Sequence, residues 1–155
     1  MVSLFIFYLH FSDRFFNFSM AGWVLLLVGS TYKCYLFANN LLTIGEANTA
    51  CTNFNTHLAQ FETLAEYNAI VTQSSVETSQ WYTIGYAGSC DIYGNVVSWS
   101  YFTGGGADMS FFTWYPGTPR TGLWWNYLLF HSRLANIYNI PNQAGYTYYY
   151  LCEFY

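Results

Sequence analysis

Two helix-start signals lie close together in the first half of the chain, and mainly strand-like segments follow them. The sequence Thr43–Glu46 (TIGE) has the pattern of a capping box, in which a threonine and a glutamate three residues later satisfy free backbone N–H groups. The sequence Thr63–Glu66 (TLAE) repeats this pattern. Because apolar residues at helical spacing follow each box, the sequence predicts two helices.

Short segments rich in aromatic and β-branched residues, separated by glycines, follow residue 80. Val97, Trp99 and Tyr101 alternate with serines, which is typical of a half-buried strand. Tyr146–Tyr155 (YTYYYLCEFY) is the strongest strand signal in the chain, and His57–Phe61 predicts a short connecting strand. Helices followed by short strands indicate an α+β fold with small antiparallel sheets.

The segment between Gly104 and Gly145 contains turns and little periodicity over about forty residues. Irregular connections of this length in a compact domain usually bind a ligand or cover a site. We therefore expect a long loop region that carries the function.

The composition excludes two classes of protein. Aromatic residues make up 23% of the chain and charged residues only 8%, which is opposite to the composition of disordered chains. The chain has four lysines and arginines in total, and its pI is about 5.0. Without a basic cluster, nucleic-acid binding is not expected.

The first thirty residues differ from the rest of the chain. Two apolar segments, Val2–His10 and Ala21–Gly29, are each shorter than the roughly 20 residues that a membrane span needs. The second has the length of a signal-peptide core and is followed by small residues. We expect residues 1–30 to be a secretory leader and residues 31–155 to form an extracellular domain. A non-native N-terminus and a membrane anchor are the alternatives.

Four cysteines, Cys34, Cys51, Cys90 and Cys152, lie too far apart for a C-x-x-C motif. Their spacing does not favour zinc or thioredoxin-like chemistry. An even number of cysteines behind a leader predicts two disulfides, and the spacing leaves all three pairings open. Free thiols are the alternative.

No group of residues has the pattern of an enzyme site. His10 lies in the predicted leader, His57 lies in the predicted connecting strand, and His131 has no acidic or thiol neighbour in the sequence. Gly104–Gly106 lacks the lysine and the helix of a phosphate-binding loop. We therefore expect a protein that is not an enzyme and uses no cofactor.

Six short motifs follow one another in order along residues 31–155. They are Tyr32–Phe37 (YKCYLF), Glu46–Cys51 (EANTAC), His57–Thr63 (HLAQFET), Tyr82–Tyr86 (YTIGY), Val97–Trp99 with Phe112–Gly117 (VSW, FTWYPG), and Leu151–Phe154 (LCEF). In this order they resemble the motifs of the C-type lectin-like domain. The resemblance implies a mixed fold whose two ends meet, and a loop region that binds ligands.

The resemblance also implies which cysteines pair. It places a disulfide between Cys51 of the first helix and Cys152 of the last strand. The second disulfide of the family is missing, because Tyr127 occupies one cysteine position and the other falls near Asn142 or Gln143. Cys34 and Cys90 are left over, so we expect them to pair with each other, with two free thiols as the alternative.

Many members of this family bind sugars through Ca²⁺, which requires several carboxylate and carbonyl oxygens. The first calcium motif corresponds to Thr118–Arg120, where a cation replaces an amide and Pro119 is expected to be cis. The second corresponds to Trp125–Tyr127 or, with better spacing, to Tyr138–Ile140. No Asp or Glu occurs between Met109 and Cys152. We therefore expect no metal site.

These residues predict a secreted recognition module that binds carbohydrate without calcium. Aromatic rings stack on the C–H faces of sugars, while amide and guanidinium groups bind their hydroxyls. The candidate ligand-binding residues are Thr118, Arg120, Trp124, Trp125, Asn126, Tyr138 and Asn139. The alternative is a protein-binding module without sugar activity, because aromatic and arginine side chains also anchor protein interfaces.

Overall fold

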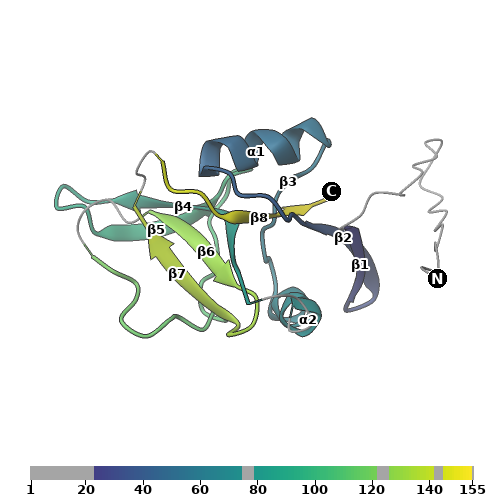
Figure 1. The fold of residues 1–155 in the computed structure, drawn as a ribbon. Helices are drawn as coiled ribbons and strands as arrows, with labels where there is room; N and C mark the ends of the chain where they lie inside the picture. Colours follow the sequence, from purple (N-terminus) through teal and green to yellow (C-terminus); the bar gives the residue numbers. More distant parts are fainter. Residues whose placement is uncertain (1–22, 75–78, 122–125, 142–144, 155) are drawn as a thin grey trace.

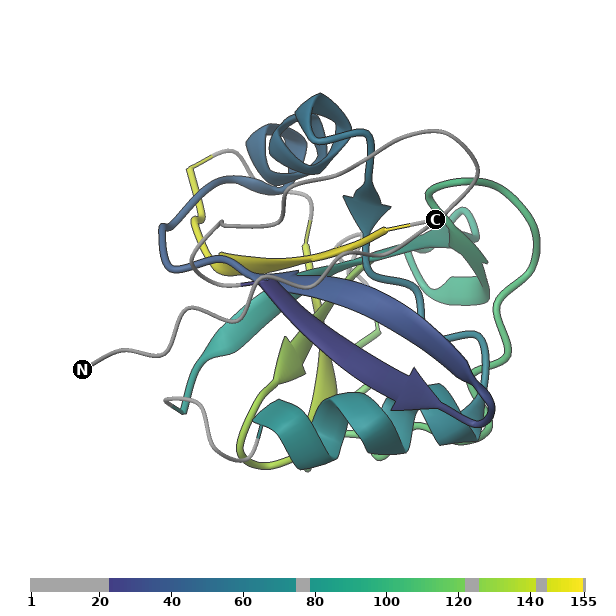
Figure 2. The ribbon, with the colours of Figure 1, turned by 90° about the vertical axis from the view of Figure 1, so that its right-hand side faces the viewer.

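The computed structural model describes residues 23–74, 79–121, 126–141 and 145–154. In chain order the elements are β1 (Trp23–Val28), β2 (Thr31–Phe37), α1 (Ile44–Asn53), β3 (His57–Leu58), α2 (Leu64–Ser74), β4 (Trp81–Cys90), β5 (Val96–Tyr101), β6 (Tyr127–His131), β7 (Asn136–Ile140) and β8 (Tyr149–Glu153). The two helices lie on opposite sides of the sheet, as Figures 1 and 2 show. The predicted α+β fold is confirmed.

The sheet has the strand order β1-β2-β8-β4-β6-β7, and β3 and β5 pair with β8 and β4. Most neighbours are antiparallel, but β4 and β8 are parallel. β2, which opens the predicted domain, is therefore the antiparallel neighbour of the final strand. The expectation that the two ends of the fold meet is thus correct.

The two predicted capping boxes behave differently. At α1, Thr43 Oγ1 accepts a hydrogen bond from Glu46 N at 3.4 Å, and Glu46 Oε2 accepts one from Thr43 N at 2.9 Å. At α2, Glu66 N donates to Thr63 Oγ1 at 3.2 Å, but the Glu66 carboxylate is buried and accepts from Glu62 N instead. Glu66 therefore begins the helix and also contributes a charge to the interior.

Each helix covers its own core. The core on the α2 side is mainly aromatic and includes Tyr35, Phe61, Tyr67, Tyr86 and Phe130. The smaller core on the α1 side consists of Leu36, Ala38, Ala47, Cys51, Leu58, Tyr150 and Cys152. Residues of β8 alternate between the two cores, as the period of a strand requires.

The domain boundary expected at residue 31 differs from the structure, because β1 belongs to the folded sheet. Trp23–Val28 pairs with β2 along its whole length, and Gly29 adopts a positive φ of 61° in the tight turn between the strands. Val24 and Leu26 pack against the α2-side core, whereas Leu27 is exposed. A leader that ended at residue 30 would remove this strand.

The expected strand at His57–Phe61 is shorter in the structure. β3 pairs with β8 only through His57 and Leu58. Beyond them, Ala59 N still donates to Leu151 O of β8 at 2.8 Å, and the backbone N–H of Gln60 donates to the Glu153 carboxylate at 3.1 Å.

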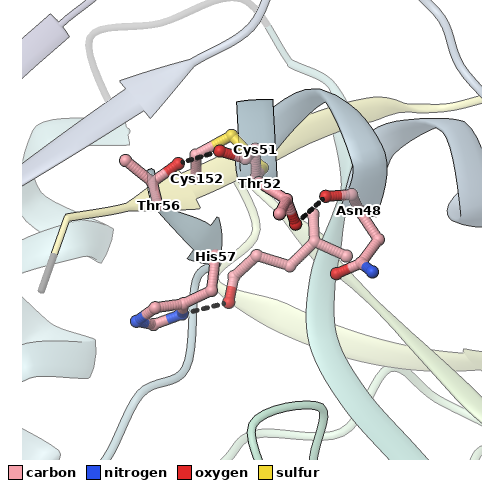
Figure 3. Close-up of a disulfide and its surroundings, with 7 residues drawn as sticks. Asn48, Cys51, Thr52, Thr56, His57 and Cys152 are labelled. Carbon is pink, nitrogen blue, oxygen red and sulfur yellow. Dashed lines mark hydrogen bonds between the residues drawn. A yellow bond between two sulfur atoms is a disulfide. The ribbon is translucent and has the colours of Figure 1, made fainter. Parts of the chain in front are cut away.

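The Cys51–Cys152 disulfide is present, with the two Cα atoms 5.5 Å apart. Figure 3 shows it between α1 and β8, beside the hydrogen bond that Thr56 Oγ1 donates to the Cys51 carbonyl at 2.7 Å. The expected Cys34–Cys90 pairing is wrong, because both are free thiols. Cys34 lies on β2 and Cys90 at the end of β4, and β8 separates these strands in the sheet.

A buried ionic cluster joins β2, α2 and β8. The Lys33 ammonium lies 2.8 Å from Glu66 Oε1 and 2.6 Å from Glu153 Oε1, and the two carboxylate side chains are only 1% and 5% exposed. Tyr35 donates its hydroxyl proton to Glu66. Burial lowers the pKa of Lys33, but its hydrogen bonds and the two negative charges raise it overall.

The disulfide encloses a long loop, with 101 residues of sequence separation between its cysteines. We predict that the double variant Cys51→Ser, Cys152→Ser loses about 4–5 kcal/mol of unfolding free energy in urea, because the unfolded chain regains the entropy of loop closure. The matched control Cys34→Ser, Cys90→Ser removes two thiols but no covalent link. An equal loss in both variants would contradict this account.

We predict an unusual pH dependence from Glu153. Burial and the Glu66 charge raise its pKa to about 7, against the opposing effect of Lys33. The folded protein therefore binds this proton more tightly than the unfolded chain, so this group lowers the unfolding free energy as pH rises from about 4.5 to about 7. Between pH 5 and pH 8, wild type should lose more stability in urea titrations than Glu153→Gln.

Glu62→Gln is the control for this measurement, because it removes a carboxylate of the same cluster whose side chain is 61% exposed. It should keep the wild-type difference between the two pH values. A Glu153→Gln variant with an unchanged difference would refute the assignment to Glu153.

Candidate functional site

The long loop region makes a tight turn just before the residues that match the first calcium motif. Thr118 N and Thr118 Oγ1 both donate hydrogen bonds to the Tyr115 carbonyl, at 3.0 and 2.5 Å. Gly117, at the third position of this Tyr-Pro-Gly-Thr turn, has a positive φ of 82° that glycine adopts without strain. The Thr118–Pro119 peptide is cis, as the family resemblance implies.

Asn139 holds the next residue of the loop in place. Its side chain is fully buried, its Oδ1 accepts from Arg120 N at 2.7 Å, and its Nδ2 donates to Arg120 O at 2.8 Å. One amide therefore binds both backbone groups of Arg120. This clamp fixes the loop against β7 while leaving the Arg120 side chain at the surface.

The same loop also pairs with β7 through its backbone. Tyr115 N donates to Ile137 O at 2.9 Å, and Ile137 N donates to Thr113 O at the same distance. Trp114 and Ile137 form a parallel bridge, which places Tyr115 level with Tyr138. In Figure 1 this connection runs beside β7.

Three aromatic side chains from separate elements meet beside this loop, and we call them the aromatic cluster: Trp81, Tyr115 and Tyr138. The Trp81 ring centroid lies 5.8 Å from that of Tyr115 and 5.7 Å from that of Tyr138, and the two tyrosines are 6.1 Å apart. Tyr115 is 38% exposed, and the other two are partly exposed. The cluster therefore presents ring surface to solvent.

Sheet register explains why the cluster forms. Trp81 pairs with His131 and Thr83 pairs with Leu129 across β4 and β6, and Leu129 pairs with Tyr138 across β6 and β7. Paired residues, and residues two apart on one strand, project from the same face of a sheet. Trp81, His131 and Tyr138 therefore share one face, although they are far apart in the sequence.

Arg120 completes the site. The carbon at the centre of its guanidinium lies 5.3 Å from the centroid of the Tyr138 ring, which is a cation–π geometry. The Arg120 residue is exposed. The site thus combines aromatic faces with a positively charged planar donor.

His131 supports the cluster and does not have the environment of a catalytic base. Its ring lies 4.6 Å from Trp81, and its Nδ1 accepts hydrogen bonds from Arg133 N at 3.2 Å and Leu134 N at 3.0 Å. Nδ1 can accept these hydrogen bonds only when it carries no proton, so the His131 ring is neutral. Burial lowers the pKa of His131, which agrees with this assignment.

The residues that the family resemblance aligns with the two calcium motifs make other contacts in the structure. Thr118 donates its hydroxyl proton to a carbonyl, the Asn139 oxygen already accepts from Arg120 N, and Arg120 is a cation. Calcium prefers several carboxylate oxygens. Among the residues that the structure describes, no three His, Cys, Asp or Glu side chains lie together where they could hold a metal.

The structure separates the sequence-predicted site residues into different roles. Arg120 and Tyr138 lie together at the surface, whereas Thr118 and Asn139 build the loop that carries them. Asn126 accepts from Gly88 N at 2.7 Å through its carbonyl, and its side-chain oxygen is buried without a hydrogen-bond partner in the described structure. Trp124 and Trp125 lie outside the described residues.

Trp81 is the site residue that the sequence interpretation missed. It begins a strand far from the long loop region in sequence, and only the pairing of β4, β6 and β7 brings it to Tyr138.

A separate hollow between β1 and α2 is lined by Leu26, Leu27, Ala65, Asn68, Ala69, Thr72 and Gln73. That lining has neither a charge nor an aromatic ring, so we place the site at the aromatic cluster.

Solved C-type lectin domains match this architecture over most of the chain. The C-type lectin domain of murine dendritic cell inhibitory receptor 2, solved in complex with N-glycan, has a TM-score of 0.66 at 18% identity and covers 86% of this chain and 96% of its own. The chain has the C-type lectin-like fold. The mouse scavenger receptor C-type lectin domain gives a TM-score of 0.62 at 17% identity, over 78% of this chain and 88% of its own.

A calcium-independent type II antifreeze protein has the same C-type lectin-like fold. Its TM-score is 0.63 at 21% identity, and the match covers 86% of this chain and 92% of its own. No protein-family model matches the sequence, and a search of curated proteins finds no relative. In the described part of the chain, neither helix has the length and apolar character that crossing a membrane requires.

We predict that Asn139→Ala loosens the loop around Arg120. The substitution leaves the Arg120 N–H and carbonyl without their partner, so the unfolding free energy should fall by about 1–3 kcal/mol. Amide hydrogen exchange should become faster at Arg120 than at Thr118, whose N–H bonds to Tyr115. Tyr138→Phe is the control, because it leaves this clamp intact; unchanged exchange at Arg120 in Asn139→Ala would contradict the proposed role.

Proposed function

We propose that the protein is a secreted recognition module that binds carbohydrate without calcium, through the aromatic cluster and Arg120. The observation that carries this proposal is the meeting of Trp81, Tyr115 and Tyr138 at a solvent-accessible position next to an exposed guanidinium. Ring faces stack on the C–H faces of a sugar, and the guanidinium donates to its oxygens. No step in this binding requires a metal ion or a catalytic residue.

The structural neighbours support the proposal in two respects. One neighbouring C-type lectin domain was solved with an N-glycan, and another protein with this fold is described as calcium-independent. The fold is thus compatible with glycan binding and with function in the absence of calcium. The ring cluster and Arg120 give a specific reason to combine both properties here.

Secretion is the second part of the proposal. The Cys51–Cys152 disulfide joins two buried sulfurs and is favoured in an oxidising compartment. The N-terminal leader remains a prediction of the sequence. Because β1 contributes Val24 and Leu26 to the core, we propose that any cleavage occurs before Trp23 and leaves this strand in the mature domain.

We predict that a glycan array detects binding that a chelator does not reduce. Tyr138→Ala should lower the affinity for the bound glycan by up to about tenfold, because we expect stacking of a sugar on a single ring to contribute about as much as an aromatic pair, about 0.5–1.5 kcal/mol. Tyr93→Ala is the matched control, since Tyr93 is 76% exposed on the β4–β5 hairpin, outside the aromatic cluster. Binding abolished by chelator would refute the metal-free mechanism.

A protein ligand is the second candidate function, and a different surface favours it. Ile92, Tyr93 and Val97 are 86%, 76% and 66% exposed on the β4–β5 hairpin. Exposed apolar side chains gathered on one hairpin are a frequent feature of protein interfaces. If the array shows no glycan binding, this hairpin becomes the preferred site for mutagenesis against a protein partner.

A further inference from the structure

Arg120 places a positive charge at the candidate site, and no acidic residue lies near it in the sequence. The stretch from Met109 to Cys152, which includes most of the long loop region, contains Arg120 and Arg133 but no Asp or Glu. We propose that Arg120 makes the site selective for sugars that carry a carboxylate or a sulfate group. This inference rests on the proposed function, because it names the class of sugar that the same site binds.

The acidic side chains that the structure describes have other roles. Glu62, Glu66 and Glu153 bind Lys33, Glu46 caps α1, Asp91 accepts from Asn95 in the β4–β5 turn, and Asp108 accepts from Ser110 N. These roles place the carboxylates at the ionic cluster, at a helix start and in turns. The site is built from β4, β7 and residues 109–121, which contain Arg120 but no Asp or Glu.

The geometry of Arg120 suits an anion that lies beside a stacked sugar ring. Asn139 fixes both backbone groups of Arg120, and the guanidinium lies over the Tyr138 ring. Because the backbone is fixed and a ring lies beneath the guanidinium, the Arg120 side chain loses less conformational entropy when it binds an anion. The planar guanidinium can donate two parallel hydrogen bonds to a carboxylate or a sulfate.

Long-range attraction does not explain such a preference. The chain has a formal net charge of −4, so the protein as a whole repels anions. A preference for an acidic sugar must therefore come from short-range contacts at one position. Removing the Arg120 guanidinium should therefore remove the preference, whereas removing a positive charge elsewhere should not.

The test compares matched pairs on the glycan array, each a neutral oligosaccharide and its sialylated or sulfated derivative. Wild type should bind the acidic member about fivefold more tightly, the effect of one well-oriented, partly exposed charge contact. Arg120→Gln should remove this preference and retain binding of the neutral member. The preference should also weaken between about 50 mM and about 500 mM salt. The sialylated pairs test recognition of a carboxylate, and the sulfated pairs test recognition of a sulfate.

Arg133→Gln is the matched control, since it removes the same charge from an exposed residue in the β6–β7 turn. Arg120→Lys keeps the charge without the planar fork and should keep only part of the preference. Thermal unfolding checks that each variant is folded. Equal binding of both pair members by wild type, or an equal loss in Arg133→Gln, would overturn the inference and leave the proposed function intact. Absence of all glycan binding would overturn both.

Discussion

The fold depends on the link between α1 and β8. Cys152 is buried between the sheet and the helix, and its bond to Cys51 holds the first helix against the strand that β2, β3 and β4 all pair with. The next residue, Glu153, projects from the opposite face and meets Lys33 and Glu66. One short strand therefore carries a covalent link on one face and an ionic cluster on the other.

These two links organise the rest of the structure in different ways. The disulfide acts mainly by limiting the unfolded chain, whereas the ionic cluster acts only in the folded state, where β2, α2 and β8 bring its charges together. Two buried carboxylates beside one lysine also explain the raised pKa of Glu153. The cluster therefore makes the interior sensitive to pH in a way that an apolar core would not be.

Local signals allowed much of the fold to be predicted, and nonlocal pairing limited the prediction. The capping boxes of Thr43 and Thr63 place both helices because their hydrogen bonds span only a few residues. The family resemblance supplied the Cys51–Cys152 pairing. The apolar segment Ala21–Gly29 has the length of a signal-peptide core and so predicts a leader, although the Gly29-Ser30 dipeptide before Thr31 is itself a hairpin-turn signal and Trp23–Val28 pairs with β2 in the structure. The Cys34–Cys90 pairing failed because leftover cysteines carry no information about strand order.

The candidate site shows the same limit. The sequence identified Arg120 and Tyr138, but Trp81 joins them only through cross-strand register. Asn139 was expected to contact a ligand, yet its amide binds the backbone of Arg120. A side-chain amide thus holds the loop at Arg120 against β7. The same loop carries the Arg120 guanidinium over the Tyr138 ring, and residues 109–152 contain no Asp or Glu, which is the sequence feature behind the proposed choice of ligand.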